Sequence, residues 1–359
     1  RTRRFARPTA HNELTSSYNY GLHLDAAEYT AYLCGHAEKL GVQRVEGGFA
    51  DVSLGKDGRV AAVLLEGGER LEADYFLDCC GREALLMNRT SPTEREDWSE
   101  WLPNDRILSL RAPAIEEPAP VTQTIAARAG WLWRVPLAQT SIAGYVYSSA
   151  FVSDDEALDR VTNARADRSE ERALMQIRQG RRKACWVRNC VAIGEAAVEL
   201  EPLVGANLHL VQLGIAAFID LFPIDQGSAL EALEYNRMMG EHADALRDFT
   251  IAHYRAGRSA RTGEYWAAIR AAALPNRLAE KLNLYRASGR INLLDNETFE
   301  EVDWAWLLLG SGCLPEAIEL HLQANLERAQ PQHLATLRTS IEKSASSMFR
   351  HIDYVRYQS

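Results

Sequence analysis

The sequence predicts an α/β protein with mixed sheets and a helical C-terminal part, and three observations lead to that prediction. Short alternating segments separated by turn residues fill 47–81 and 101–150. Two apolar runs end in a glycine, at Gly81 and Gly194, as buried strands of α/β sheets often do. Helical spacing dominates from Gly205 onward. We therefore expect a first domain over 1–222 and a helical C-terminal cap over 223–359.

The first third of the chain predicts one helix and a series of strands. Residues 25–40 have helical spacing, and Gly41 stands where a helix C-cap is expected. The segment 47–81 predicts three short strands joined by two turns, Lys56-Asp57-Gly58 and Glu66-Gly67-Gly68. Its last strand, 73–80, is largely apolar, so we expect it to be buried on both faces with Cys79 and Cys80 as buried thiols.

The remaining elements follow from the same patterns. Four antiparallel strands are predicted over 107–110, 122–126, 130–136 and 142–148. Ser153, followed by three acidic residues, predicts the start of a helix over 153–179. A further strand is expected over 186–194. The helices of the last part are expected over 205–221, 228–256, 262–271 and 316–348.

Composition and charge exclude several classes of protein. The 359 residues include 40 Lys and Arg against 49 Asp and Glu, so the net charge of −9 disfavours nucleic-acid binding. No run of eighteen apolar residues predicts a membrane span, and no signal peptide opens the chain, so we expect a cytoplasmic protein. The six cysteines form no C-x-x-C pair, and no two of the nine histidines stand four apart, so no metal site is expected.

Three segments have features of a binding site. A small residue at a strand end lets a ligand approach the backbone, which is the situation of Gly81 and Gly194. After Gly194, the sequence Glu201-Pro202-Leu203-Val204-Gly205-Ala206-Asn207 leads into a helix whose free N–H groups favour an anion. Period-two spacing places Trp131 and Trp133 on one strand face, as a flat wall for a ring or as core residues.

Common catalytic signatures are missing from the sequence. It contains no G-x-G-x-x-G, no P-loop, no H-E-x-x-H and no G-x-S-x-G. The sequence therefore does not indicate a kinase, a zinc protease or an α/β-hydrolase.

The sequence resembles the flavin-dependent halogenases of the tryptophan halogenase type. Trp131 to Pro136 fits the family's W-x-W-x-I-P, and Val191 to Leu210 is similar to its A-I-G-x-A-A-G-F-x-E-P-L-E-S-T-S-I-H-L loop. Five further segments match in the same order along the chain. They are His23-Leu24-Asp25-Ala26, Asp78 to Arg82, Gly144 to Ser149, Arg247 to Tyr254, and the late glycine box Gly310, Gly312 and Pro315.

The resemblance implies a partial FAD-binding, monooxygenase-like fold and a halogenation reaction. Reduced FAD from a separate flavin reductase would react with O₂ and with chloride or bromide, giving hypohalous acid that halogenates a small electron-rich aromatic such as tryptophan or an indole. The helical part would cap the substrate, and a homodimer is the expected assembly. The implied site residues are Gly81, Trp131, Trp133, Gly194, Pro202 and Gly205 for the cofactor, Ala206 and Asn207 for halide, and Phe299 and Trp304 for substrate.

The chain also departs from the family pattern. The second Glu of E-P-L-E-S-T falls on Val204, whose side chain can neither accept nor donate a hydrogen bond. The family's dinucleotide fingerprint and catalytic lysine lie ahead of the segment matched by His23, so neither is assigned here. Pro202, Gly205 and Asn207 also partly match a loop of the related flavin hydroxylases. A hydroxylating flavin monooxygenase and a truncated relative without catalysis are therefore the alternatives.

The aromatic residues near 300 have two interpretations. The resemblance places substrate-stacking rings near Phe299, Trp304 and Trp306, whereas ordinary core packing would explain the same residues. If the segment is a helix, Trp304 and Trp306 do not share a face, and at most one of them points into a given pocket.

Overall fold

The computed structural model describes residues 3–8, 20–91, 94–163, 171–224, 229–256, 262–317 and 331–358. It divides into two compact units, each assembled from separate stretches of chain. The first unit takes its residues from Arg1–Arg44, Arg106–Met175 and Ile318–Ser359, and the second from Val45–Asp105 and Gln176–Ala317.

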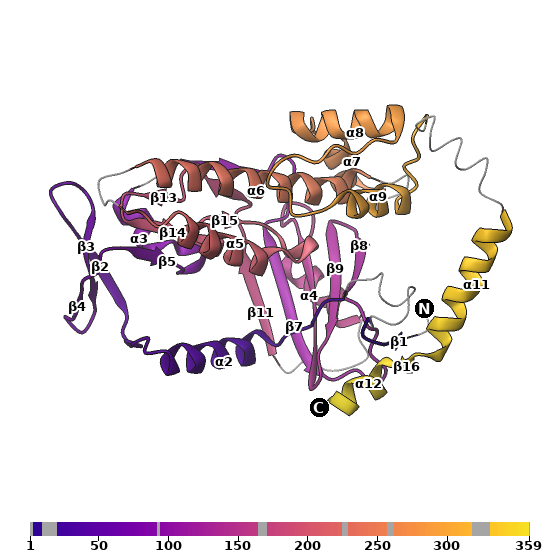
Figure 1. Cartoon of the computed structure of the whole chain (residues 1–359), viewed down its shortest axis with the longest axis horizontal. Helices are drawn as coiled ribbons and strands as arrows, with labels where there is room; N and C mark the ends of the chain where they lie inside the picture. Colours follow the sequence, from indigo (N-terminus) through magenta and orange to yellow (C-terminus); the bar gives the residue numbers. More distant parts are fainter. Residues whose placement is uncertain are drawn as a thin grey trace. The chain divides into compact units, whose positions relative to one another are not determined.

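A five-stranded sheet forms the centre of the first unit (Figure 1). Its order is β11–β7–β10–β9–β8, and the neighbours from β7 to β8 are antiparallel, so the four strands predicted over 107–148 are confirmed. The strands are β7 Arg106–Pro113, β8 Gln123–Ala127, β9 Gly130–Pro136, β10 Thr140–Tyr147 and β11 Glu171–Gln176.

The helix predicted over 153–179 is only partly correct. Helix α4 spans Asp154–Asn163, and Ser153 Oγ accepts the backbone N–H of Glu156 at 3.2 Å, as a helix start requires. However, residues 171–176 form the edge strand β11, all six of them exposed. Pairing with β7 outweighs the helix propensity of Ala, Leu, Met and Gln in this segment.

The rest of the first unit consists of helices and one small sheet. Helix α2, Ala26–Lys39, begins at Asp25, whose carboxylate accepts the N–H of Ala27 at 3.0 Å, and Gly41 follows with φ +91°, so this prediction is confirmed. The two ends of the described chain pair as an antiparallel ladder of Arg4–Phe5 with Phe349–Arg350. These elements are β1 Arg4–Phe5, α11 Pro331–Ser347, β16 Phe349–Arg350 and α12 His351–Gln358.

The second unit begins with the strand series predicted around 47–81. Strands β2 Phe49–Leu54, β3 Val60–Leu65 and β4 Arg70–Leu71 form an antiparallel meander. Both predicted turns are confirmed. Gly58 and Gly68 adopt φ values of +75° and +84°, which residues other than glycine rarely adopt.

A short parallel pair follows, and it corrects three predictions. Strand β5, Phe76–Asp78, lies parallel to β14, Cys190–Ala192. Leu77 is 44% exposed, and Cys79 and Cys80 are also exposed, so the strand is not buried on both faces and its thiols are not buried. The single strand expected over 186–194 is instead a hairpin of β13, Trp186–Val187, and β14, since Arg188 turns the chain with φ +54°.

Helices make up most of the remainder of the second unit, around the long central helix α6. The helices predicted over 205–221, 228–256 and 262–271 are confirmed to within a few residues. Of the helix predicted over 316–348, residues 318–330 lie outside the described part, 316 and 317 are not helical, and α11 confirms the end. The helices are α3 Leu85–Thr90, α5 Asn207–Asp220, α6 Leu230–Arg255, α7 Glu264–Ala271, α8 Asn276–Ser288 and α9 Glu301–Gly310.

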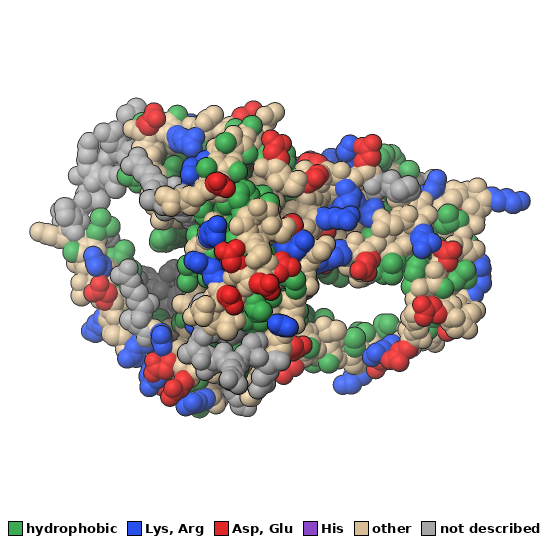
Figure 2. Space-filling view, turned by 180° about the vertical axis from the view of Figure 1, so that it is seen from behind, with side chains coloured by type: hydrophobic (Ala, Val, Ile, Leu, Met, Phe, Trp, Pro, Cys, Tyr) green, Lys and Arg blue, Asp and Glu red, His purple; other side chains and the backbone are tan. Residues whose placement is uncertain are grey.

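The predicted α/β class is therefore confirmed, with parallel, antiparallel and helical parts all present. Residues 223–317 belong to the same compact unit as residues 45–105 and 176–222. The division of the chain into a domain over 1–222 and a substrate cap over 223–359 stays a prediction. Among the described helices, none is long and apolar enough to cross a membrane. Figure 2 shows acidic and basic side chains interspersed over the visible face.

Candidate functional site

Two of the predicted cofactor residues come together at one sheet edge in the second unit. Because β5 and β14 are parallel, their carboxyl ends meet at the same edge, where ligands bind in open α/β sheets. Each strand leads into a 3-10 turn that begins at a glycine, η1 Gly81–Glu83 and η2 Gly194–Ala196, and these turns contact each other. Gly81 and Gly194 have φ values of +71° and +67°, so both positions favour glycine.

Asp78 organises the turn that carries Gly81. Its side chain is fully buried; Oδ1 accepts the N–H of Cys80 at 3.1 Å, and Oδ2 accepts the N–H groups of Leu86 and Met87 at 3.0 and 2.9 Å. One carboxylate thus fixes the turn and satisfies the start of helix α3. Sequence reasoning missed this role, although an acidic residue inside an apolar strand was the available signal.

A cluster of charges borders the same edge. Arg82 Nη2 lies 3.3 Å from Glu195 Oε2, and Arg82 Nε lies 3.7 Å from Glu199 Oε1. Arg95 Nη2 approaches the other oxygen of Glu199 at 3.8 Å. Burial raises the pKa of Glu199, and the two guanidinium groups oppose that rise. Among the described residues, Glu199 Oε1 has no hydrogen-bond partner.

Glu201, which directly precedes the loop that leads into helix α5, anchors that loop through its buried carboxyl group. The Glu201 carboxyl is fully buried; it accepts hydrogen bonds from the Tyr254 hydroxyl, from Asn104 Nδ2 at 2.8 Å and from Gln179 Nε2 at 3.0 Å. Asn104 Nδ2 also donates to the Tyr254 oxygen at 2.7 Å, and the Tyr265 hydroxyl donates to Asn104 Oδ1 at 2.9 Å. These five side chains form the Glu201 network, which joins α6 and α7 to the loop.

The loop itself, from Pro202 to Asn207, leaves backbone N–H groups accessible for hydrogen bonds to a ligand. Pro202–Val204 form the 3-10 turn η3, and Gly205 follows with φ +66° and open space where a Cβ would be. No side chain of the described residues caps the start of α5 after Ala206, and the Asn207 amide turns back to the carbonyl of Leu200 at 3.3 Å. The N–H groups of this helix start therefore keep the positive potential that suits an anion.

Val204 lies half-buried at the end of η3, where the family pattern has a carboxylate. The nearest carboxyl along the chain, Glu201, is fully buried and committed to its three donors. The loop therefore offers no open carboxylate from positions 201 to 207.

The two tryptophans of β9 lie in the first unit and share one sheet face. Register pairs Trp131 with Val146 and Trp133 with Gly144, whereas α4 covers the other face, where Tyr147 donates a hydrogen bond to Asp154 at 2.7 Å. Trp131 is 5% exposed and Trp133 is half-buried.

The Trp133 indole lies directly against Gly144. A Cβ at Gly144 would lie 2.6 Å from Trp133 Nε1, so only glycine permits this ring position. The Trp133 Nε1–H is buried and finds no acceptor among the residues that the structure describes. A buried N–H without a partner is costly and points to a group that can accept it.

The aromatic residues near 300 are arranged mainly by packing. Trp304 is 1% exposed, its Nε1 donates to Glu297 Oε2 at 3.1 Å, and Lys281 Nζ lies 4.7 Å from its ring centroid. Phe299 is half-buried and stacks on Phe249 at 3.9 Å between centroids. This environment favours the packing interpretation for Trp304.

The orientation predicted for the two indoles of α9 is confirmed. Trp304 faces the core, whereas Trp306 is 74% exposed, because residues two apart on a helix point in different directions. No group of three or more possible metal-ligating side chains gathers within the described ranges.

The sheet edge and loop fit a flavin in the chemistry of their donors. Gly81, Gly194 and Gly205 leave the backbone accessible, and the uncapped start of α5 supplies N–H donors for an anion. In the first unit, the Trp133 N–H, which has no acceptor among the described residues, adds a donor beside an apolar wall. The residues present are therefore compatible with the cofactor and halide that the sequence implies.

Comparison with known proteins gives a consistent result. A family model described as tryptophan halogenase matches residues 1–326. Tryptophan 7-halogenase KtzQ of Kutzneria sp. (strain 744) is 32% identical, over 93% of this chain and 67% of that protein. Tryptophan 7-halogenase RebH of Lentzea aerocolonigenes is also 32% identical, over 76% of this chain and 53% of that protein. The aligned part thus spans between about half and two thirds of these relatives.

Solved structures are similar over almost the whole chain. BrvH, a flavin-dependent halogenase from Brevundimonas sp. BAL3, has a TM-score of 0.93 and 30% identity, covering 99% of this chain and 73% of that one. Xcc4156, a flavin-dependent halogenase from Xanthomonas campestris, has a TM-score of 0.91 and 34% identity, and the match covers 99% of this chain and 71% of that one.

Proposed function

Since this chain belongs to the tryptophan halogenase family, we propose that the protein halogenates a small electron-rich aromatic ring, such as tryptophan or another indole. The reaction would use FAD reduced by a separate flavin reductase, together with O₂ and chloride or bromide. The observation that carries the proposal is the sheet edge where Gly81 and Gly194, both with left-handed φ, end two parallel strands next to each other.

The residues of this edge would hold the flavin and the halide. Gly81 and Gly194 present backbone without side chains, and Pro202 and Gly205 shape the loop that precedes α5. The N–H groups of Ala206 and Asn207 would hold the halide, because backbone donors do not depend on the side chain at position 204. When bound, reduced flavin supplies the oxidising chemistry with O₂.

The aromatic residues would separate and orient the reactants. Trp131 and Trp133 share one face of β9 as a rigid pair of indoles, and the resemblance implies that they would keep the substrate ring from direct contact with the flavin. Phe299 would contact the substrate, and Trp304 would support it through Phe249, whose ring packs against both. The expected homodimer stays a prediction.

The main test is product analysis with the protein, FAD, a flavin reductase, O₂ and either chloride or bromide. We expect a product heavier than the indole substrate by one halogen in place of hydrogen, and none without halide. A hydroxylated product whose yield ignores halide would instead establish the alternative, a flavin monooxygenase, which the missing carboxylate at Val204 favours. Bound FAD without any product over a panel of aromatic substrates would reject both reactions.

A pair of glycine variants tests the assigned cofactor edge without relying on turnover. Gly194→Ala places a Cβ 3.1 Å from Val211 in a left-handed conformation, whereas Gly68→Ala has the same kind of strain with open space around it. We expect Gly194→Ala to weaken FAD binding at least tenfold by fluorescence titration and Gly68→Ala to leave it unchanged. Equal affinities in the two variants would remove Gly194 from the cofactor site.

A further inference from the structure

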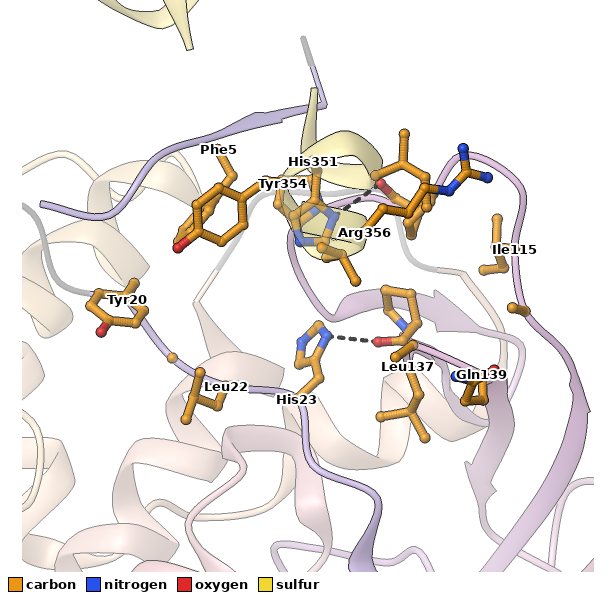
Figure 3. A pocket seen from close by; sticks show the side chains of 18 of the residues that line it. Phe5, Tyr20, Leu22, His23, Ile115, Leu137, Gln139, His351, Tyr354 and Arg356 are labelled. Atoms are coloured by element: carbon orange, nitrogen blue, oxygen red, sulfur yellow. Dashed lines mark hydrogen bonds between the residues drawn. The ribbon is translucent and has the colours of Figure 1, made fainter. Parts of the chain in front are cut away.

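The first unit contains a hollow whose lining includes none of the residues proposed above for flavin, halide or substrate. Its volume is about 460 Å³, within the range of small-molecule sites. Its walls come from the chain around Phe5 and Tyr20–His23, the loop 114–120, the turn 136–139 and helix α12 (Figure 3). Tyr20 and Leu22 are 46% and 70% exposed, so the hollow is open to solvent on that side.

One side of the hollow is aromatic. The rings of Phe5 and Tyr354 pack edge to face at 4.9 Å, and Tyr20 lies 6.0 Å from Phe5. Figure 3 shows Phe5 and Tyr354 together on one side of the space. Such a surface favours a flat ring, which can stack or pack edge-on against it.

His23 and His351 face each other across the space (Figure 3). They differ in how many of their ring nitrogens form hydrogen bonds with described residues. His23 Nδ1 donates to the Pro136 carbonyl at 3.0 Å, and His23 Nε2 pairs with the Thr122 hydroxyl at 3.1 Å, so this ring is fully engaged. His351 Nδ1 donates to the Pro118 carbonyl at 3.4 Å. Burial lowers the pKa of His351, and His23 adds to that effect. The neutral His351 ring therefore keeps Nε2 as an acceptor, without a partner among the described residues.

The charged residues of the hollow favour an anion. Arg7 and Arg356 line it, against a single carboxylate, Glu116. Neither arginine forms an ion pair with another residue in the part of the chain that the structure describes. The planar guanidinium group matches the geometry of a carboxylate and frequently binds one through two parallel N–H···O hydrogen bonds.

We propose that this hollow binds a small aromatic carboxylate that also carries a ring hydroxyl or N–H. The ring packs against Phe5 and Tyr354, the carboxylate pairs with Arg7 and Arg356, and the hydroxyl or N–H donates to His351 Nε2. The three contacts match the three kinds of group in the walls, and none of them involves residues proposed for flavin, halide or substrate.

The test uses 4-hydroxyphenylacetate as the probe, by isothermal titration calorimetry without FAD or halide. Two analogues each remove one group: 4-ethylphenol lacks the carboxylate, and 4-methoxyphenylacetate lacks the donor. We expect the probe to bind at least tenfold more tightly than either analogue. No binding at millimolar concentration, or equal binding of the probe and 4-ethylphenol, would overturn the proposal.

Variants assign the contacts. Arg7→Gln and Arg356→Gln should each weaken the probe about tenfold and leave 4-ethylphenol unchanged. Arg338→Gln, which removes an exposed arginine of α11 outside the hollow, should change neither. His351→Phe should abolish the preference for the probe over its methoxy analogue; a preference that survives in this variant would remove His351 from the site.

The outcome is independent of the proposed halogenation. Gly194→Ala leaves every wall of the hollow untouched, so the probe should bind that variant as it binds the unmodified chain. Loss of probe binding in Gly194→Ala would show that the probe occupies the cofactor edge instead and would overturn this proposal alone.

Discussion

The Glu201 network makes a sharp prediction about stability, because one buried carboxyl collects several donors. Tyr254→Phe removes only the hydroxyl that donates to Glu201 and retains the buried ring. A hydrogen bond to a charged group contributes about 1.5–3 kcal/mol, whereas one to a neutral acceptor contributes about 1 kcal/mol. We therefore expect Tyr254→Phe to lower the free energy of unfolding by about 2 kcal/mol, or more if Asn104 Nδ2 is left with one acceptor fewer.

Tyr265→Phe is the matched control. It removes a hydroxyl from the same network, but that hydroxyl donates to the neutral amide oxygen of Asn104 at 2.9 Å. Urea denaturation should give a loss of about 1 kcal/mol for this variant, with the same dependence on denaturant as Tyr254→Phe. The two variants thus separate the effect of the carboxylate from that of losing a buried hydroxyl.

The same pair of variants tests whether the network anchors the loop. Tyr254→Phe should speed hydrogen exchange at the backbone amides of 205–207, because Glu201 directly precedes η3. If Tyr254→Phe costs no more stability than Tyr265→Phe and leaves loop exchange unchanged, then Glu201 is not the centre of the network and the reasoning fails.

Three other outcomes follow from single contacts. Gly144→Ala should cost about 2 kcal/mol and change the near-UV circular dichroism of Trp133, since the added Cβ would collide with the Leu108 carbonyl oxygen and lie 2.6 Å from the Trp133 indole; an unchanged spectrum would contradict the packing described. Lys281→Met should cost about 3–5 kcal/mol in thermal unfolding, because the buried Glu297 carboxylate keeps its N–H donors Trp304 and Leu294 but loses its cation partner, and adding Glu297→Gln should recover most of it. Burial raises the pKa of Asp248 from 3.8 to about 6, so its native form takes up a proton first. The free energy of unfolding should therefore rise, relative to Asp248→Asn, by roughly 3 kcal/mol in total as the pH falls from well above 6 to well below 3.8; a pH-independent difference would reject this assignment.

The sequence predicted those parts of the fold that depend on local pattern. Alternation and turn glycines predicted the four strands over 107–148 and both turns of the meander, because these signals act within a few residues. The strand Glu171–Gln176 was missed, since its residues favour a helix and only pairing with β7 keeps them extended. The exposed Cys79 and Cys80 were missed because apolarity alone does not tell which side of a strand is covered.

The site divides in the same way. The glycines at 81, 194 and 205 could be predicted, because each follows an apolar run or precedes a helix. The roles of Asp78 and Glu201 could not, since their partners stand far away in sequence: Asn104 and Tyr254 lie 97 and 53 positions from Glu201. A single sequence shows an acidic residue in an apolar stretch, but not the donors that make it stable there.

The segment composition of the two units has a consequence for how this protein can be dissected. The chain passes from one unit to the other at 44/45, 105/106, 175/176 and 317/318. No single cleavage therefore releases either unit as a continuous piece, and a truncation at either end removes residues of the first unit before it reaches the second. During synthesis, the pairing of Arg4 with Arg350 must wait until residue 350 has left the ribosome. Independent production of a unit would therefore require its separate segments to be joined directly to one another.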